Sequence, residues 1–265
     1  MKRLKDYEKR ELIRLIKEGK SLNYISGLMK RRKSTLYHYY KKIMGKKLSD
    51  VRIDKYDDLF MGELIGLFVG DGGLYYDKIY GKYRICFFFN FAEKEYVNNL
   101  TSFFEEKFNK KPNVYRSKNV LIVRYYSKKL FMFLKEHVGW DISKNLIKKK
   151  KSRSVFLKKE KYSREFKKGF LRGFIDSDGY FSQKKILFGS TSEKIMKQTE
   201  GFLTDLSYKY YKLSFYKDKR REGSGIWHLY VHKCERNKFL KDINPRNITK
   251  CVIGESNPCQ LVGNQ

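Results

Sequence analysis

An internal repeat limits the fold of this chain more than any single motif does. The segments LFMGELIGLFVGDGG (59–73) and EFKKGFLRGFIDSDG (165–179) are both apolar stretches that end in a glycine-rich acidic corner. Asp178 lies 107 residues after Asp71, and the late segments LKEHVGWDISK (134–144) and LKDINPRNITK (240–250) match at an offset of 106 residues. Because two distant anchors agree to one residue, we expect two copies of one structural unit.

Each copy has the same predicted order of elements, αββαββα. An apolar helix precedes each corner, and alternating aromatic and polar residues then predict pairs of strands between amphipathic helices. The fold class is therefore α+β, with two pseudo-symmetric repeats. The first repeat has expected strands at 74–80, 83–91, 113–117 and 120–126 and helices at 93–108 and 128–138; the second has strands at 179–183, 186–191, 211–217 and 226–232 and helices at 193–208 and 235–243.

The charge of the chain indicates the kind of partner. Lys and Arg number 60 against 29 Asp and Glu, a formal net charge of +31, and such self-repulsion is typical of a protein that binds nucleic acid. No apolar run approaches the roughly 18 residues of a membrane span, and the first residues lack the apolar core of a signal peptide. The four cysteines form no CxxC pair, so a disulfide framework is not expected and the cytoplasm is the predicted location.

The first 45 residues predict a small helical domain. Helix 8–18, a second helix capped by Ser21, a basic turn at 30–33 and a third helix capped by Ser34 have the spacing of a helix-turn-helix. A plain three-helix bundle with a solvated basic edge is the alternative. In the helix-turn-helix interpretation, the third helix reads the major groove of DNA through Ser34, Thr35, Tyr37, His38 and Lys41.

The predicted domain organisation follows from these segments. Residues 1–45 form the helix-turn-helix domain and 46–58 a polar linker. The repeats occupy 59–152 and 153–250, and 251–265 form a tail with no assigned role.

The acidic corners carry the predicted chemistry. Gly66 and Gly173 lie in mid-helix, where glycine costs about 1 kcal/mol relative to alanine, so close approach of the two helices should offset that cost. Such packing would bring Asp71 and Asp178 together at the negative ends of two helix dipoles, an unfavourable arrangement that a divalent cation relieves. Oxygen ligands suit Mg²⁺ (or Mn²⁺), and the predicted metal site comprises Asp71, Asp178, Gly70 and Ser177. The alternative is that both Asp-Gly pairs are merely helix-ending turns.

Residues 64–72 (LIGLFVGDG) and 171–179 (LRGFIDSDG) resemble the LAGLIDADG motif of homing endonucleases. The second match is very close, and the first departs at Val69, where the family often has an acid. Two motifs in a duplicated pattern imply a single-chain, monomeric endonuclease that cuts both strands of DNA at a long, loosely palindromic site. The resemblance also implies a basic residue late in each half. The repeat nominates Lys144 and Lys250, and Lys148 to Lys151 compete for that role.

The two sheets are expected to form a saddle whose free face holds DNA. Strand alternation points His228, Tyr230 and His232 outward in the second half, and Ile122, Arg124 and Tyr126 outward in the first. The loop residues Lys219, Arg220 and Arg221 would reach flanking backbone phosphates. Zinc at His228, His232 and Cys234 is not expected, because strand spacing spreads these ligands too far for one ion.

Two other functions use the same scaffold. One is a catalytically inactive DNA-binding transcriptional regulator, and the other is a maturase that binds intron RNA. Retention of both motif aspartates argues against the first, because a pure binder gains nothing from two facing carboxylates. A comparison of binding to duplex DNA and to intron RNA would discriminate the second.

Overall fold

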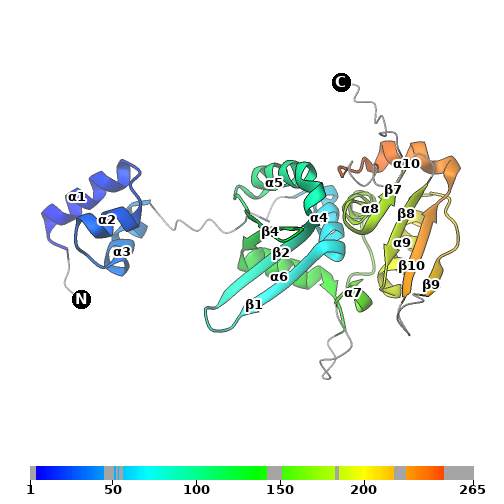
Figure 1. Ribbon diagram of the computed structural model, residues 1–265, viewed down its shortest axis with the longest axis horizontal. Coiled ribbons are helices and arrows are strands. Elements are labelled where there is room, and N and C mark those ends of the chain that lie inside the picture. Colours follow the sequence, from blue (N-terminus) through cyan, green and yellow to red (C-terminus); the bar gives the residue numbers. More distant parts are fainter. Residues whose placement is uncertain are drawn as a thin grey trace. The chain divides into compact units, whose positions relative to one another are not determined.

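The computed structural model describes residues 4–44, 51, 53, 56–141, 151–182, 185–217 and 225–247 (Figure 1). The chain divides into two compact units, Met1–Ser49 and Asp50–Gln265. In the described part of the chain, none of the helices is both long and apolar enough to cross a membrane.

The first unit contains three helices, α1 (Asp6–Lys17), α2 (Leu22–Leu28) and α3 (Lys33–Met44). They enclose a small apolar core that includes Leu12, Ile25 and Leu36. The Ser21 hydroxyl accepts a hydrogen bond from the Tyr24 amide at 3.2 Å and so caps α2, as the sequence predicts. The prediction that Ser34 caps α3 is wrong. The Arg32 carbonyl accepts from the amides of residues 35 and 36, so Ser34 already lies in the first helical turn.

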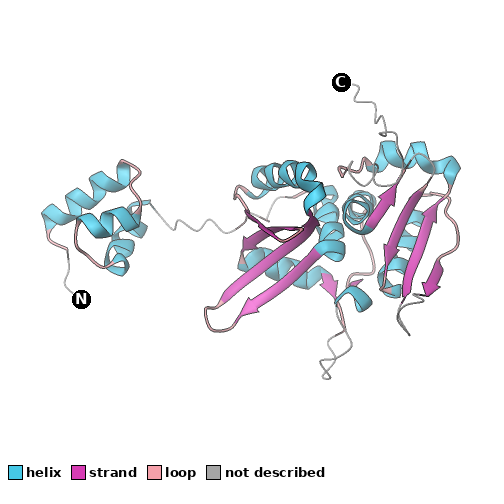
Figure 2. Cartoon of the chain, viewed as in Figure 1, coloured by secondary structure: helices cyan, strands magenta, loops and turns pink. Residues whose placement is uncertain are grey.

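Two αββαββα repeats make up the second unit, which confirms the predicted fold class (Figure 2). The first repeat forms an antiparallel sheet in the order β1-β2-β4-β3 and the second a sheet in the order β7-β8-β10-β9. The elements of the first repeat are α4 (Asp58–Asp71), β1 (Gly72–Asp77), β2 (Lys82–Asn90), η1 (Phe91–Glu93), α5 (Lys94–Phe108), β3 (Asn113–Ser117), β4 (Val120–Tyr126) and α6 (Lys128–His137). Those of the second are α8 (Arg164–Asp178), β7 (Gly179–Phe181), β8 (Ile186–Ser190), α9 (Glu193–Asp205), β9 (Ser214–Lys217), β10 (Gly225–Val231), η2 (Lys233–Glu235) and α10 (Arg236–Ile243).

A short third sheet, β5 (Val138–Gly139) with β6 (Phe156–Leu157), joins the end of the first repeat to the start of the second. The helix α7 (Lys151–Ser154) lies just before β6. Part of the segment that the sequence predicts as a linker packs on the core of this unit. Val51 is fully buried there, and the Tyr56 hydroxyl donates to the Lys107 carbonyl at 2.6 Å.

Helices α4 and α8 pack side by side between the two sheets (Figure 1). A methyl group on Gly66 would overlap the Phe170 carbonyl and lie 2.7 Å from the Phe174 amide nitrogen. By the repeat, a methyl group on Gly173 would overlap the Glu63 carbonyl and lie 2.7 Å from the Leu67 nitrogen. One turn earlier, Gly62 and Gly169 make the same kind of backbone contact, which the sequence analysis missed. These four glycines therefore allow direct contact between the backbones of α4 and α8.

We predict that Gly66→Ala lowers the free energy of unfolding by about 1–3 kcal/mol, because the added methyl group must push two helix backbones apart. Gly201→Ala in α9 is the matched control. A methyl group there meets nothing within 4 Å, and alanine in a helix is favoured over glycine by up to about 1 kcal/mol. Urea unfolding followed by circular dichroism measures both, and equal stability of the two variants would contradict the packing account.

Candidate active site and nucleic-acid interface

Asp71 and Asp178 are the last residues of α4 and α8, and each is followed directly by the first strand of its sheet. Gly70 and Ser177 precede them, and a methyl group on Gly70 would lie 2.6 Å from the Ser177 Cβ and 3.1 Å from the Asp178 carboxyl carbon. The ends of the two helices therefore meet, and the carboxylates lie at this meeting point. Asp178 is exposed and Asp71 is partly exposed, so both residues retain solvent-accessible surface.

Lys151, the first residue of α7, is a cation that interacts electrostatically with both aspartates of this acidic centre. Its Nζ donates to the carbonyls of Phe68 and Gly72 at 2.5 Å each, and Gly70 O lies 3.4 Å away. These carbonyls end α4, where the helix dipole is negative. Burial lowers the pKa of the Lys151 ammonium from 10.5 to about 8, and the negative charges of Asp178 and Asp71 oppose that decrease. Carbonyl oxygens at the C-terminal end of α4 therefore surround the Lys151 ammonium.

A buried ionic network lies about two turns before the acidic residues in the helix pair. Glu63 of α4 is only 1% exposed and accepts from Arg172 of α8 at 3.2 Å and from Arg246 at 2.5 Å. Arg172 Nε also donates to the Ile243 carbonyl at 2.6 Å. Because both guanidinium groups converge on one carboxylate, the buried charge of Glu63 is compensated. The network fastens the segment after α10 to the helix pair.

Asp176 has a supporting role and is fully buried. Its carboxylate accepts from the backbone amides of Arg246 and Asn247 at 3.0 Å each. Burial raises the pKa of Asp176 to about 7, and the two amide hydrogen bonds oppose that increase. The Asn247 side chain donates in turn to the Asp176 carbonyl and to Glu93. The residue at this position in the first repeat is Val69, so only α8 anchors a chain segment in this way.

Several predicted site residues fall outside the described residues. They are Lys144, Lys250, Lys219, Arg220 and Arg221. Of the competing lysines 148–151, only Lys151 is described, and it is the one that interacts with both aspartates. From the sequence, Lys151 is one of four consecutive lysines with nothing to distinguish it. Its contact with the end of α4 depends on where the tertiary structure places α7.

The outer faces of both sheets carry the predicted DNA-contacting side chains. On β4, Leu121, Val123 and Tyr125 are buried, whereas Ile122, Arg124 and Tyr126 alternate with them on the open face. On β10, Leu229 and Val231 are buried, and His228 and Tyr230 are partly exposed, as is His232 directly after the strand. His232 Nδ1 lies 2.9 Å from Cys234 Sγ, but the described residues include no group of three His, Cys, Asp or Glu side chains suited to a metal ion.

In the first unit, Ser34, Tyr37, His38 and Lys41 are exposed on α3. Thr35 is only 8% exposed and lies beside the buried Leu36, so its side chain is turned toward the core. Four of the five predicted recognition residues are thus presented to solvent.

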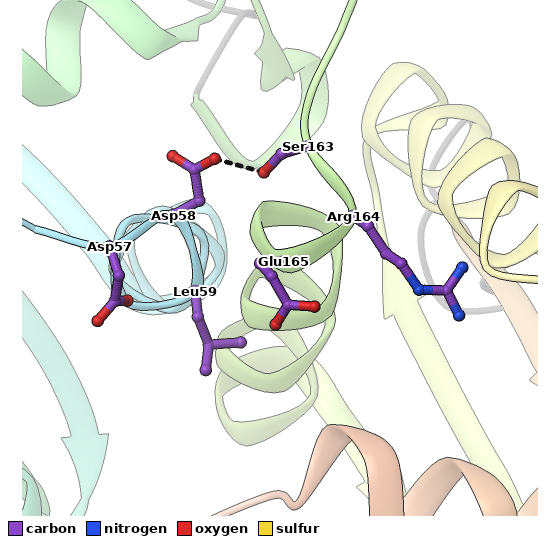
Figure 3. A pocket seen from close by; sticks show the side chains of 6 residues that line it. All are labelled: Asp57, Asp58, Leu59, Ser163, Arg164 and Glu165. Atoms are coloured by element: carbon purple, nitrogen blue, oxygen red, sulfur yellow. Dashed lines mark hydrogen bonds between the residues drawn. The ribbon is translucent and has the colours of Figure 1, made fainter.

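A hollow of about 520 Å³ lies at the other end of the helix pair (Figure 3). The first turns of α4 and α8 line it, and the Ser163 hydroxyl donates to Asp58 there at 2.5 Å. Asp57 and Ser163 cap the two helices by accepting from Phe60 N and Phe166 N. The acidic side chains at this end complement the positive ends of the helix dipoles, which is a structural role.

Comparison with known proteins assigns this architecture. Residues 165–244 match the family model of a LAGLIDADG-like domain. The homing endonuclease I-DmoI, solved in complex with DNA and Ca, is 20% identical, with a TM-score of 0.50 over 70% of this chain and 89% of that one. A variant of I-DmoI, solved with its target DNA in the presence of Mg, is 19% identical, with a TM-score of 0.51 over 71% and 96% of the two chains. No curated protein matches the sequence.

The class of protein is therefore a two-repeat α+β protein with the fold of single-chain homing endonucleases. Residues 165–244 of the second repeat are similar to a LAGLIDADG-like domain, and α4 of the first repeat packs against the motif helix α8. At this level of identity, the structural likeness establishes the fold.

We predict that the Lys151 side chain titrates near pH 8, whereas ordinary lysines titrate near 10.4. Asp178→Asn should lower the pKa of Lys151 further, because the lost negative charge had raised it. NMR titration of the lysine side chains measures this, with Lys151→Met to assign the resonance and Asp205→Asn as a control at an exposed carboxylate. A titration of Lys151 together with the other lysines would contradict the burial of its ammonium.

We also predict that Asp176→Ala lowers the free energy of unfolding by about 1–3 kcal/mol, because two amides lose their acceptor. The control Asp205→Ala removes an ion pair with Lys167 whose carboxylate is 53% exposed, and it should cost less than about 1 kcal/mol. Thermal and urea unfolding measure the difference. Equal effects of the two substitutions would remove Asp176 from its anchoring role.

Proposed function

We propose that this chain is a site-specific endonuclease that binds double-stranded DNA across its two sheets and hydrolyses one phosphodiester bond in each strand. The observation that carries the proposal is the meeting of Asp71 and Asp178 at the ends of two helices in contact, beside Lys151. The solved structures of I-DmoI in complex with DNA support duplex DNA as the ligand of this fold. The formal charge of +31 supports it independently.

A divalent metal ion fits the acidic centre. The donors there are two carboxylates and the backbone carbonyls that end α4, all oxygen atoms, which Mg²⁺ and Mn²⁺ prefer. Three of these carbonyls lie within 3.4 Å of the Lys151 Nζ, so their oxygen atoms already accept from a cationic group. Asp71 and Asp178, with the backbone at Gly70 and Ser177, would hold the ion. When bound, it supplies Lewis-acid stabilisation of the phosphate and a water of lowered pKa.

The remaining roles belong to side chains of the chain itself. Asp71 and Asp178 orient the attacking water, each mainly for one strand. The Lys151 ammonium interacts electrostatically with both aspartates. We assign it the central basic role, stabilising negative charge on the scissile phosphate, for which the repeat nominates Lys144 and Lys250. Lys144 and Lys250 stay candidates for further phosphate contacts. The first unit would add affinity through Ser34, Tyr37, His38 and Lys41, which are exposed on α3.

We predict that Asp71→Asn and Asp178→Asn each reduce double-strand cleavage at least about 100-fold, because metal binding supplies several kcal/mol of transition-state stabilisation. Binding to DNA should persist, since each variant keeps the sheets and removes a negative charge. The substrate is a plasmid that carries the insertion site of the chain's own gene, incubated with Mg²⁺ or Mn²⁺. Linear product, nicked product and bound complex are measured separately, with Asp205→Asn as the matched control.

The outcomes separate the proposal from its two rivals. Cleavage by wild type and by Asp205→Asn, with its loss in both active-site variants, supports the endonuclease. Tight duplex binding by wild type without cleavage in any divalent metal identifies a DNA-binding regulator on this scaffold. Stronger binding to the host intron RNA than to the duplex identifies a maturase.

A further inference from the structure

We propose that Arg84 and Arg124 read two guanines in the half of the target that lies against the first sheet, and that the second sheet imposes no matching guanine preference. The inference rests on the proposed binding of duplex DNA and names a feature of the target that this chain requires. Arg84 is not among the residues that the sequence analysis singled out.

The two arginines lie on one face of the first sheet. On β2, Ile85, Phe87 and Phe89 are buried toward the helices, so Arg84 belongs to the opposite, open face. Arg84 pairs with Tyr126 across β2 and β4, and Arg124 pairs with Cys86. The arginines are therefore diagonal neighbours, about 7–8 Å apart at their backbones.

Tyrosine rings hold both guanidinium groups in place. Arg84 lies 4.8 Å over the ring of Tyr75, and Arg124 lies 4.3 Å over that of Tyr115. Arg124 also donates to the hydroxyls of Tyr115 and Tyr126. Because stacking restricts both side chains before DNA arrives, less conformational entropy is lost on binding. These tyrosines are 37–42% exposed, so the stacks stand at the surface.

The charge of both arginines is available to a ligand. Within the described residues, neither guanidinium forms an ion pair with a carboxylate, and the Nε of each is buried without a hydrogen-bond partner. Both side chains are partly exposed, so their terminal N–H groups, and not the enclosed Nε atoms, are the donors that a ligand can reach. The ligand must carry acceptors in a plane that matches the guanidinium fork.

Guanine is the base that presents this pattern in the major groove. Its O6 and N7 are both acceptors and bind arginine through two hydrogen bonds, whereas adenine places a donor beside its N7. A separation of about 7–8 Å corresponds to roughly two base pairs at about 3.4 Å each. Along β2, Arg84 lies three residues from Phe87, the partner of Gly72, or about 10 Å from the end of α4. We therefore expect the guanines within a few base pairs of the cleavage centre.

The second sheet has a different open face. Its outward positions on β8 and β10 are Leu187, Gly189, Ile226, His228 and Tyr230, and no arginine occurs among the described residues of this sheet. Burial lowers the pKa of the His228 imidazole, and its ring packs 4.5 Å from that of Tyr216. Apolar side chains contact the methyl group of thymine, and neutral polar side chains form single hydrogen bonds with several bases. Neither kind of group forms the paired hydrogen bonds with which arginine recognises guanine. The two halves of the target should therefore differ in guanine preference.

Selection of bound duplexes from a randomised library, in the presence of EDTA so that no strand is cut, tests the inference. Wild type should select two guanines roughly two base pairs apart on one side of the site. Arg84→Ala should lose the preference at one of these positions and Arg124→Ala at the other, each binding the wild-type site about 10- to 100-fold more weakly. Arg116→Ala is the matched control. Arg116 is an exposed arginine stacked 3.6 Å over Phe91, but it pairs with the buried Leu121 and belongs to the opposite face.

Replacement of each selected guanine by 7-deazaguanine provides a second measurement, because it removes the N7 acceptor alone. Wild-type affinity should fall, whereas the variant that lacks the corresponding arginine should show no further loss. A selected site without the paired guanines, or an equal loss of affinity for every base in both variants, overturns the inference and reduces the arginines to phosphate contacts. Duplex binding without any base preference overturns the inference alone, and failure of wild type to bind any duplex overturns the proposed function as well.

Discussion

Direct backbone contact between α4 and α8 is the constraint on which the rest of the structure depends. Gly62, Gly66, Gly169 and Gly173 leave no side chain between the helices, and each glycine lies directly against backbone atoms of the other helix. This contact places the ends of the helices together, sets the two sheets on either side and fixes where Asp71 and Asp178 lie. Any side chain at these glycines would separate the acidic residues before it affected either sheet.

Bringing the helix ends together concentrates negative charge. Basic side chains compensate this charge at two places, at the helix ends and further back between the helices. At the helix ends, the buried Lys151 ammonium donates to the carbonyls that end α4 and interacts with both aspartates. Deeper in the helix pair, Arg172 and Arg246 neutralise Glu63. The two compensations differ in kind. Glu63 is enclosed and serves the fold, whereas Asp71 and Asp178 retain exposed surface and the buried Lys151 ammonium lies beneath them.

The two repeats share a backbone arrangement but differ in the chemistry of their faces. The first sheet exposes arginines stacked on tyrosines, and the second exposes histidine, tyrosine and aliphatic side chains. The buried anchor also differs, since Asp176 in the second repeat corresponds to Val69 in the first. Symmetry of fold therefore brings the two aspartates together, and under the proposed function the asymmetry of side chains lets each half bind a different sequence.

The sequence by itself determined the repeat, the order of elements and the position of both aspartates at helix ends, because periodicity and glycine spacing are local signals. It also determined which side chains of β4 and β10 point outward, since strand alternation is local too. Only the tertiary structure decided which lysine reaches the acidic centre, which arginines stack on which rings and that Asp176 anchors residues 246 and 247. These contacts join residues far apart in the chain, and their partners are chosen by how helices and strands pack, which no local pattern records.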